Sequence, residues 1–378
     1  MAKTYKYPFL PLKEVNAPYR DELAAAALRV IDSGYYIGGP ELENMERMLA
    51  AMHGAPYAVG VTNGLDALRL SLRGYMELGR LKAGDEVLVP ANTYVATVLA
   101  ITDNGLTPVF VEPDDTTLNM DSSLLERHLT ARTRAVMPVH LYGRACWDDR
   151  LASFARDTDL LVIEDNAQAI GAVATADGLF GGRHTGSLGH AGAFSFYPTK
   201  NIGALGDAGA VVTHDPELAA AIRAIRNYGS DRQYHNIYKG LNCRLDPMKA
   251  AMLAVKLPHT DAENGRRRAN AAVYEAEIVN PLVRKPLWTP GADCVWHQYV
   301  VRVDDRERFR AYLADNGVET AVHYATPPHR QPCYAEYAGL HLPVTDAIAR
   351  TVVSLPVSPA TTPDDARAIA AIVNRYVG

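Results

Sequence analysis

The chain has 378 residues, of which 48% are hydrophobic and 21% are charged, and its formal net charge is −5. This length predicts about two domains, and the composition is that of an ordinary globular protein. The acidic balance argues against the basic surface of a nucleic-acid-binding protein, so we expect no nucleic acid partner.

The sequence carries no signal for export or membrane insertion. Residues 1–15 lack the apolar core of a signal peptide, and no stretch reaches the roughly 18 uninterrupted apolar residues of a membrane span. We therefore expect a cytoplasmic protein that has no membrane partner. Free thiols, with neither a disulfide framework nor a metal site, are expected because no C-x-x-C spacing occurs among Cys146, Cys243, Cys294 and Cys333.

Two amphipathic helices are predicted first, over residues 19–34 and 40–54, and each ends on a glycine. Short apolar runs then alternate with helical stretches as far as residue 213. The predicted strands are 57–62, 85–90, 107–113, 134–143, 160–165, 191–197 and 208–213, and the predicted helices between them are 65–78, 93–102 and 122–129.

The alternation of strand and helix predicts a layered α/β domain. Nearly continuous apolar runs such as 160–165 are typical of strands that are buried on both faces of a parallel sheet. Such strands are joined by right-handed crossovers. After residue 257 the pattern predicts a strand at 294–303, a helix at 306–317, a strand at 318–324 and a helix at 364–377. We expect a large domain over residues 1–257, with the N-terminal helices, and a smaller α+β domain over residues 258–378.

Polar residues follow several of the predicted strands, at the edge where open parallel sheets bind ligands. Asp165 ends one strand, Gly64 and Tyr94 follow two others, and Ser195 and Lys200 lie at the end of another. Each residue also has an ordinary structural interpretation, such as a helix cap, a tight turn, a packed ring or a surface lysine. Their arrival at one edge of one sheet favours a shared site.

These residue types suit one cofactor. A glycine at the start of a helix offers free N–H groups to a phosphate, and an aromatic ring can stack on a flat heterocycle. A buried carboxylate can keep a pyridine nitrogen protonated, and a desolvated lysine can form a Schiff base with an aldehyde. The set therefore indicates pyridoxal 5′-phosphate. A dinucleotide is disfavoured because no G-x-G-x-x-G follows a strand and no phosphate-binding P-loop motif occurs.

Several segments match one known pattern, notably VIEDNAQAIGA, FSFYPTKNIGALGDAGAVV and GLNCRLDPMKAA. With these motifs the chain resembles the DegT-type nucleotide-sugar aminotransferases. The resemblance runs nearly end to end, and its most specific parts are E-D-x-A-Q-A and the serine five residues before Lys-Asn. It implies the aspartate-aminotransferase (fold-type I) architecture, with a three-layer α/β/α large domain and a mostly parallel sheet.

The resemblance implies a role for each matching residue. Lys200 would be the Schiff-base lysine and proton shuttle, Asp165 the partner of the pyridine nitrogen, and Gln168 the neighbour of the ring hydroxyl. Tyr94 would stack on the ring. The phosphate would be held by Gly64, Leu65 and Ser195 of the same subunit and by Asn242 of the other subunit of a homodimer. The residues placed where family members bind the amino donor or the sugar nucleotide are Arg244, His323 and His329.

The chain departs from the family pattern at three places. Leu65 stands where the family usually has serine or threonine, so only its backbone N–H can serve the phosphate. Lys249 replaces a glutamine. The stretch around residues 171–190 is longer than is typical, and the pattern assigns it no role.

The resemblance implies an aminotransferase that loads nitrogen from glutamate and passes it to a keto sugar nucleotide. The segment GALGDAGA (residues 203–210), with Asp207, is similar to the subgroup that aminates carbon 3. We therefore expect a dTDP-3-keto-6-deoxyhexose as the substrate and a dTDP-3-amino-3,6-dideoxyhexose as the product. The alternatives are a 4-keto substrate, a non-catalytic regulator of the same fold, and a lysine-less sugar dehydratase. Lys200 disfavours the last two.

Overall fold

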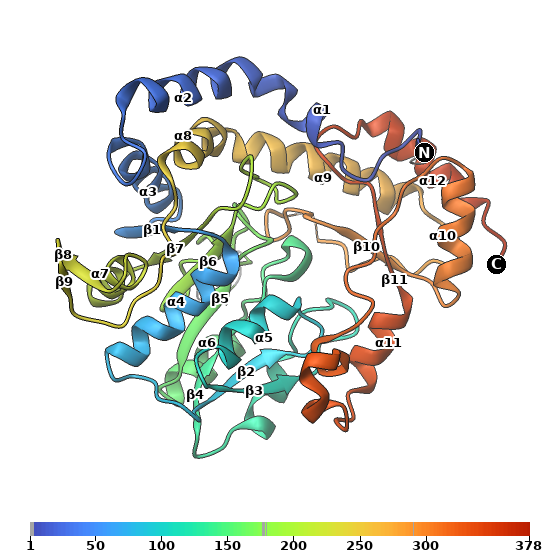
Figure 1. The fold of residues 1–378 in the computed structure, drawn as a ribbon. Coiled ribbons are helices and arrows are strands. Elements are labelled where there is room, and N and C mark those ends of the chain that lie inside the picture. The colour runs from blue at the N-terminus through green and yellow to red at the C-terminus, as the bar shows by residue number, and fades with distance from the viewer. Residues whose placement is uncertain (1–3, 176–177, 179, 290) are drawn as a thin grey trace.

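The computed structural model describes residues 4–175, 178, 180–289 and 291–378 (Figure 1). Within these ranges seven strands form the main sheet: β1 (Tyr57–Val61), β2 (Glu86–Pro90), β3 (Thr107–Val111), β4 (Thr133–Val136), β5 (Leu161–Asp165), β6 (Ala191–Ser195) and β7 (Gly209–Thr213). Two small sheets pair β8 (Ser230–Arg232) with β9 (His235–Asn236), and β10 (Tyr299–Arg302) with β11 (Val352–Leu355).

The strand order of the main sheet is β1-β7-β6-β5-β4-β2-β3. β7 pairs antiparallel with both of its neighbours, whereas the other neighbouring strands pair in parallel. The predicted mostly parallel sheet is therefore confirmed. At one end of β7, Gly209 pairs with Ser195 on one side and with Val61 on the other. A Cβ atom on Gly209 would lie 2.3 Å from the carbonyl oxygen of Asn63, so glycine is required there.

The described residues form twelve α-helices: α1 (Leu12–Asn16), α2 (Arg20–Ser33), α3 (Pro40–Met52), α4 (Gly64–Glu77), α5 (Val95–Thr102), α6 (Asp149–Asp157), α7 (Pro216–Ile225), α8 (Pro247–Lys256), α9 (Thr260–Glu277), α10 (Arg306–Asp315), α11 (Pro343–Thr351) and α12 (Pro363–Asn374). The 3₁₀ turns are η1 (Ala17–Tyr19), η2 (Ser122–His128), η3 (Leu141–Gly143), η4 (Leu257–His259), η5 (Pro328–Arg330) and η6 (Pro332–Tyr337). Among these helices, none is long and apolar enough to cross a membrane.

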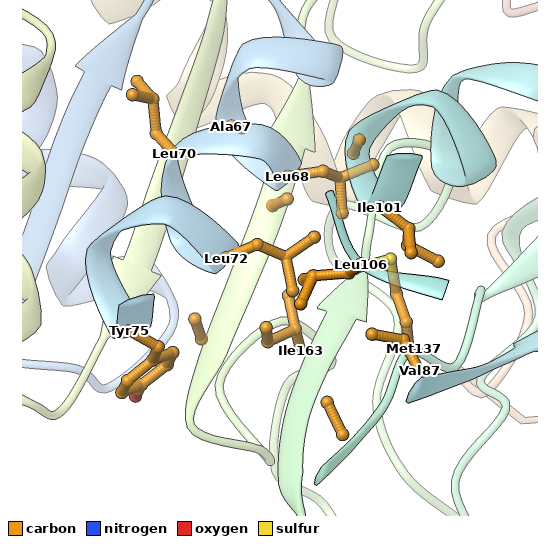
Figure 2. Close-up of a cluster of buried hydrophobic side chains, with 14 of the residues drawn as sticks. Ala67, Leu68, Leu70, Leu72, Tyr75, Val87, Ile101, Leu106, Met137 and Ile163 are labelled. Carbon is orange, nitrogen blue, oxygen red and sulfur yellow. The ribbon is translucent and has the colours of Figure 1, made fainter. Parts of the chain in front are cut away.

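Helices cover both faces of the main sheet and so form three layers (Figure 1). Side chains alternate between the faces of a strand. Val211 accordingly packs in a cluster with α4 and α7, while its neighbour Val212 packs in another cluster with α3 and α8. Figure 2 shows the first cluster, in which Leu72 of α4 lies over Ile163 of β5. Burial on both faces explains the continuous apolar runs of the sequence.

A separate core lies between β10, β11, α9, α10 and α12, where Tyr274, Tyr299 and Phe309 are buried. The predicted domain boundary after residue 257 falls in η4, directly before α9. The boundary itself stays a prediction.

Four predicted elements differ from the structure, and the first is the strand expected at 294–303, which begins at Tyr299 as β10. The strand expected at 134–143 ends at Val136, because Pro138 has no N–H group with which to continue a ladder. The helix expected at 122–129 is the 3₁₀ turn η2. Residues 318–324 form no strand, and their pairing with β11 is a single bridge between Ala321 and Ser354.

Candidate active site

A cavity of about 540 Å³ lies at the carboxyl ends of β1, β2, β5 and β6 and is also lined by the segments that carry His297 and His323. The sequence-predicted residues that line it are Gly64, Leu65, Tyr94, Asp165, Gln168, Ser195, Lys200 and His323. Its volume lies in the usual range for a small-molecule site. The expected gathering of Gly64, Tyr94, Asp165, Ser195 and Lys200 at one edge of the sheet is therefore what the structure has.

The first turn of α4 forms one wall of the cavity. The Asn63 side chain caps this helix by accepting a hydrogen bond from the Asp66 N–H at 2.8 Å. Gly64 and Leu65 lie in the first turn, where N–H groups have no partner within the helix. A Cβ atom on Gly64 would lie 2.6 Å from the Ser195 Cβ, so glycine allows the serine to lie against the helix end. Backbone N–H groups and a hydroxyl group in this arrangement fit a phosphate.

Asp165 is a buried carboxylate at the end of β5. Its Oδ2 accepts a hydrogen bond from Thr97 Oγ1 at 2.8 Å, and its Oδ1 accepts one from the Ala167 N–H at 3.1 Å. Burial raises the pKa of Asp165, while these two hydrogen bonds and the nearby Lys200 charge oppose the increase. A carboxylate held in this way fits the ring nitrogen of pyridoxal phosphate.

The Gln168 amide has a fixed orientation. Its Oε1 accepts a hydrogen bond from the Tyr142 N–H at 2.6 Å, and its Nε2 donates to the Tyr324 hydroxyl at 3.0 Å. Gln168 therefore presents its amide hydrogens on the side of Tyr324, which also lines the cavity.

Lys200 follows β6 and lines the same cavity. Burial lowers the pKa of its ammonium to about 8, against the raising effect of the Asp165 charge. The next residue anchors the loop, because the Asn201 amide donates to Asn264 Oδ1 at 2.8 Å and to the Val295 carbonyl at 3.1 Å. The lysine is thus held on a fixed backbone, with an amine that is neutral in a substantial fraction near physiological pH.

The cavity residues that the sequence did not single out include His297, Tyr324 and Thr97. His297 Nδ1 lies 3.0 Å from Asn201 Oδ1, and burial lowers the pKa of His297 well below its usual value. Tyr324 has its ring centroid 5.1 Å from that of Tyr94. Thr97 lies one turn beyond Tyr94 in the predicted helix, and this spacing from a strand end was the one local signal available for it.

Tyr94 and His323 lie at the cavity as expected. Tyr94 is 52% exposed and lines the cavity, as a ring that stacks on a planar group must. His323 Nδ1 lies 2.8 Å from the Ser354 hydroxyl oxygen, and burial lowers the pKa of His323 to about 4. His323 is therefore a neutral ring in this wall.

The structure places three predicted site residues outside the cavity. Asn242 is exposed, and Arg244 Nη1 donates to Asn227 Oδ1 at 2.7 Å. His329 is fully buried in η5, and its Nε2 lies 3.2 Å from Asp346 Oδ1. Its position in the interior gives no support to the expected contact of His329 with substrate, which stays a prediction.

The structure shows the contacts of two departures from the family pattern, Lys249 and the longer stretch around residues 171–190. Lys249 Nζ forms an ion pair with Asp246 at 2.9 Å, and its side chain lies beside Gly206, in the loop that follows Lys200. In the longer stretch, residues 176, 177 and 179 lie outside the described residues. Its described part includes Thr185, whose hydroxyl donates to the Ala169 carbonyl at 3.2 Å. Ala169 directly follows Gln168 in the chain.

Comparison with known proteins identifies the family of the chain. Residues 19–374 match the DegT/DnrJ/EryC1/StrS aminotransferase family. The chain is 47% identical to a dTDP-3-amino-3,6-dideoxy-alpha-D-galactopyranose transaminase of Aneurinibacillus thermoaerophilus over 98% of this chain and 99% of that protein. It is 46% identical to a dTDP-3-amino-3,4,6-trideoxy-alpha-D-glucose transaminase of Streptomyces venezuelae, over 95% and 93% of the two chains.

A solved structure agrees with these relatives. The fold is similar to that of S. venezuelae DesV in complex with a ketimine intermediate, with a TM-score of 0.93 and 44% identity over 99% of this chain and 100% of the other. The large α/β domain expected from the sequence is therefore the fold-type I architecture. The chain belongs to the DegT/DnrJ/EryC1/StrS aminotransferase family.

Proposed function

We propose that the protein transfers an amino group from glutamate to a keto sugar nucleotide, with pyridoxal phosphate as its cofactor. The observation that carries the proposal is the meeting of Lys200, Asp165 and the first turn of α4 around one cavity. When bound, pyridoxal phosphate supplies an electron sink for the carbon atom that exchanges nitrogen.

The residues of the chain divide the work between them. The first turn of α4 and the Ser195 hydroxyl bind the phosphate. Asp165 holds the proton on the ring nitrogen, and its hydrogen bonds from Thr97 and Ala167 keep the carboxylate oriented for this contact. Lys200 Nζ moves the proton at the reacting carbon, and a pKa of about 8 suits an amine that both gives and takes a proton near neutral pH.

We further propose a dTDP-3-keto-6-deoxyhexose as the amine acceptor. Two relatives that match nearly the whole chain are named for dTDP sugars with an amino group at carbon 3. Asp207, in the segment that resembles the carbon-3 subgroup, lines the same cavity as Lys200. The backbone path of this segment sets how the sugar lies against the lysine, and small displacements of reacting groups are costly.

We also propose that the active site is completed by a second copy of the chain. Among the described residues that line the cavity, Lys200 is the one lysine or arginine. A cofactor phosphate and the carboxylates of glutamate need further positive or N–H-donating groups. Asn242 and Arg244 lie outside the cavity of their own chain, which suits residues that serve the partner subunit's site.

The proposal is tested by incubating the enzyme with pyridoxal phosphate, glutamate and either the 3-keto or the 4-keto dTDP sugar. NMR then locates the new amine, which we expect at carbon 3, and Lys200→Ala serves as the inactive control. An amine found at carbon 4 alone would replace the proposed substrate. Binding of pyridoxal phosphate without transfer to either sugar would instead favour a regulator.

A further inference from the structure

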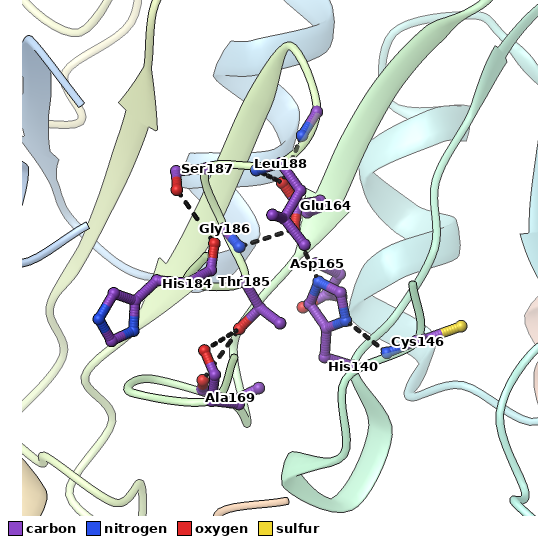
Figure 3. A network of polar contacts seen from close by, with 12 residues as sticks. His140, Cys146, Glu164, Asp165, Ala169, His184, Thr185, Gly186, Ser187 and Leu188 are labelled. Atoms are coloured by element: carbon purple, nitrogen blue, oxygen red, sulfur yellow. Dashed lines mark hydrogen bonds and ion pairs between the residues drawn. The ribbon is translucent and has the colours of Figure 1, made fainter. Parts of the chain in front are cut away.

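Glu164 is a fully buried carboxylate beside Asp165 on β5, and it has no part in the function proposed above. Neighbouring residues of a strand point to opposite faces, so Glu164 points away from the cavity that Asp165 lines. Figure 3 shows both residues with the polar groups around Glu164. A charged group this deep in a protein requires hydrogen-bond partners.

The carboxylate of Glu164 has three backbone partners in one segment of the chain. Its Oε1 accepts hydrogen bonds from the N–H groups of Leu188 and Gly189, both at 2.8 Å, and its Oε2 accepts one from the Gly186 N–H at 2.7 Å. Gly186 has a positive φ of 82°, and a Cβ atom there would lie 2.4 Å from the Phe194 ring. The segment 184–189 is therefore wrapped closely around one side chain.

The fourth partner is His140, whose Nε2 lies 2.9 Å from Glu164 Oε2. The other ring nitrogen, Nδ1, accepts a hydrogen bond from the Cys146 N–H at 2.8 Å. Because one nitrogen of a neutral imidazole carries the hydrogen, Nε2 is the donor to Glu164. Both oxygens of Glu164 thus accept two hydrogen bonds each, and Glu164 holds the segment after β4 as well as the segment before β6.

Each of these segments leads to Gln168. On one side, Thr185 donates from its hydroxyl to the Ala169 carbonyl at 3.2 Å and from its N–H to the Ala172 carbonyl at 3.0 Å. These contacts support the turn that carries Gln168 (Figure 3). On the other side, the chain runs two residues from His140 to Tyr142, whose N–H donates to Gln168 Oε1.

We propose that Glu164 is a positioning residue that orients the Gln168 amide toward the ring hydroxyl of bound pyridoxal phosphate. It acts through the segment 184–189 and through His140. The proposal also gives a role to the described part of the longer stretch, which closes around Glu164. It rests on the proposed cofactor, although it does not depend on which sugar is aminated.

Glu164→Gln tests the proposal with little change of shape. The glutamine side chain has one accepting oxygen, and its NH₂ group would face N–H donors that now bind a carboxylate oxygen. In the protein without cofactor, we expect faster amide hydrogen exchange in the peptide that spans 184–190. Glu86→Gln is the matched control, because Glu86 is also buried but lies at the opposite end of the sheet, next to Arg132.

The second readout is the visible absorption of the protein loaded with pyridoxal phosphate. The visible absorption of bound pyridoxal phosphate changes with its protonation, and the midpoint is the pH at which half of this change has occurred. A hydrogen-bond donor to the ring oxygen favours the unprotonated form, so loss of that donor raises the midpoint. We expect Glu164→Gln and Gln168→Leu each to raise this midpoint, and Glu86→Gln to leave it unchanged. The double variant should show no further rise beyond Gln168→Leu alone, since Glu164 acts through Gln168.

The proposal is overturned if Glu164→Gln has the wild-type midpoint. It is also overturned if Glu164→Gln raises the midpoint of Gln168→Leu by as much as it raises that of the wild type. If Glu164→Gln does not fold, Thr185→Val is the alternative variant, because it removes one supporting hydroxyl and retains Glu164. Thr185→Val should raise the midpoint by less than Gln168→Leu does. An unchanged midpoint would count against the proposal. A wild-type protein that binds pyridoxal phosphate but aminates no sugar refutes the proposed function and leaves this test intact.

Discussion

Two opposing effects act on the pKa of Lys200. Burial lowers the pKa of its ammonium to about 8, and the Asp165 charge raises it. Since burial is the larger effect, the lysine loses its proton well below the pH at which an exposed lysine would. The neutral amine is the form that attacks an aldehyde.

The rate at which the cofactor-free protein captures an aldehyde should therefore depend on pH. As the pH falls below 8 a growing fraction of Nζ is protonated and cannot attack, so the rate should rise with pH through a midpoint near 8 and level off above it. Stopped-flow absorbance with pyridoxal measures this rate without contributions from a phosphate ionisation. Lys200→Ala is the control, and a midpoint near that of a solvent-exposed lysine would contradict the assignment.

Removing the Asp165 charge should affect turnover more than binding. Asp165→Asn retains the shape of the side chain but no longer holds a proton on the ring nitrogen, which is needed mainly in the transition state. We expect turnover to fall by on the order of 10²–10³-fold, while pyridoxal phosphate still binds. Steady-state kinetics with a cofactor titration checks this, and wild-type turnover in the variant would exclude the role.

At the scale of elements, the helix α5 supports the site through a hydrogen bond to Asp165 at the end of β5. Thr97 of α5 donates to Asp165 Oδ2, and Thr93 Oγ1 lies 2.7 Å from Thr97 Oγ1. This short helix thus connects the end of β2 to the end of β5. Its contribution is electrostatic, because a hydrogen bond to a carboxylate lowers the pKa of that carboxyl.

Thr97→Val should shift the acid side of the pH–activity profile. Loss of the hydroxyl removes an effect that lowers the pKa of Asp165, so the carboxyl takes up its proton at a higher pH as the solution is acidified. The profile of turnover against pH should therefore fall off earlier on its acid side. Thr93→Val is the control and should give a smaller shift; an unchanged acid side in Thr97→Val would contradict the argument.

The elements differ in how far the sequence could predict them. β5 and β7 were predictable because strands buried on both faces leave continuous apolar runs. Residues 318–324 are rich in β-branched and aromatic side chains, as strands are, yet they turn into the cavity wall at His323 and Tyr324 instead of extending the ladder. The residue types of a segment favour an extended backbone and do not record whether that backbone has a neighbour to pair with.

The residues of the site also differ in how far the sequence could predict them. Asp165 and Lys200 follow strands of one sheet, so the rule for the carboxyl ends of parallel strands brings them together. His297 reaches the cavity from the segment before β10, and its contact with Asn201 joins residues 96 positions apart. Glu164 is part of the motif VIEDNAQAIGA, but its partners lie in two other segments that no local pattern connects.

At the scale of the whole molecule, apolar side chains are exposed around the β8–β9 hairpin. Tyr234 is 93% exposed, and Tyr228, Ile237 and Leu241 are also exposed. Exposed apolar groups gathered on one surface are typical of a protein interface. Asn242 lies directly after this group, so an interface here would bring it to a second chain.

A mixing experiment tests the proposed shared site. Lys200→Ala and Asn242→Ala should each be impaired, and a hybrid dimer should have one site with both residues intact. Random exchange of equal amounts should restore about a quarter of wild-type activity, because half of the dimers are hybrids with one working site of two. Activity after unfolding and refolding the mixture measures this. No recovery after confirmed subunit exchange would contradict the shared site.

The pairing of Gly209 with both Ser195 and Val61 has a consequence for substitutions in the segment before it. It pins the two ends of the segment 196–208 to adjacent strands, and this segment carries Lys200 and Asp207. The segment is therefore a loop whose two ends are fixed by the sheet. A substitution at an exposed position within it, such as Asp207, would change what faces the cavity while the flanking strands stay in register.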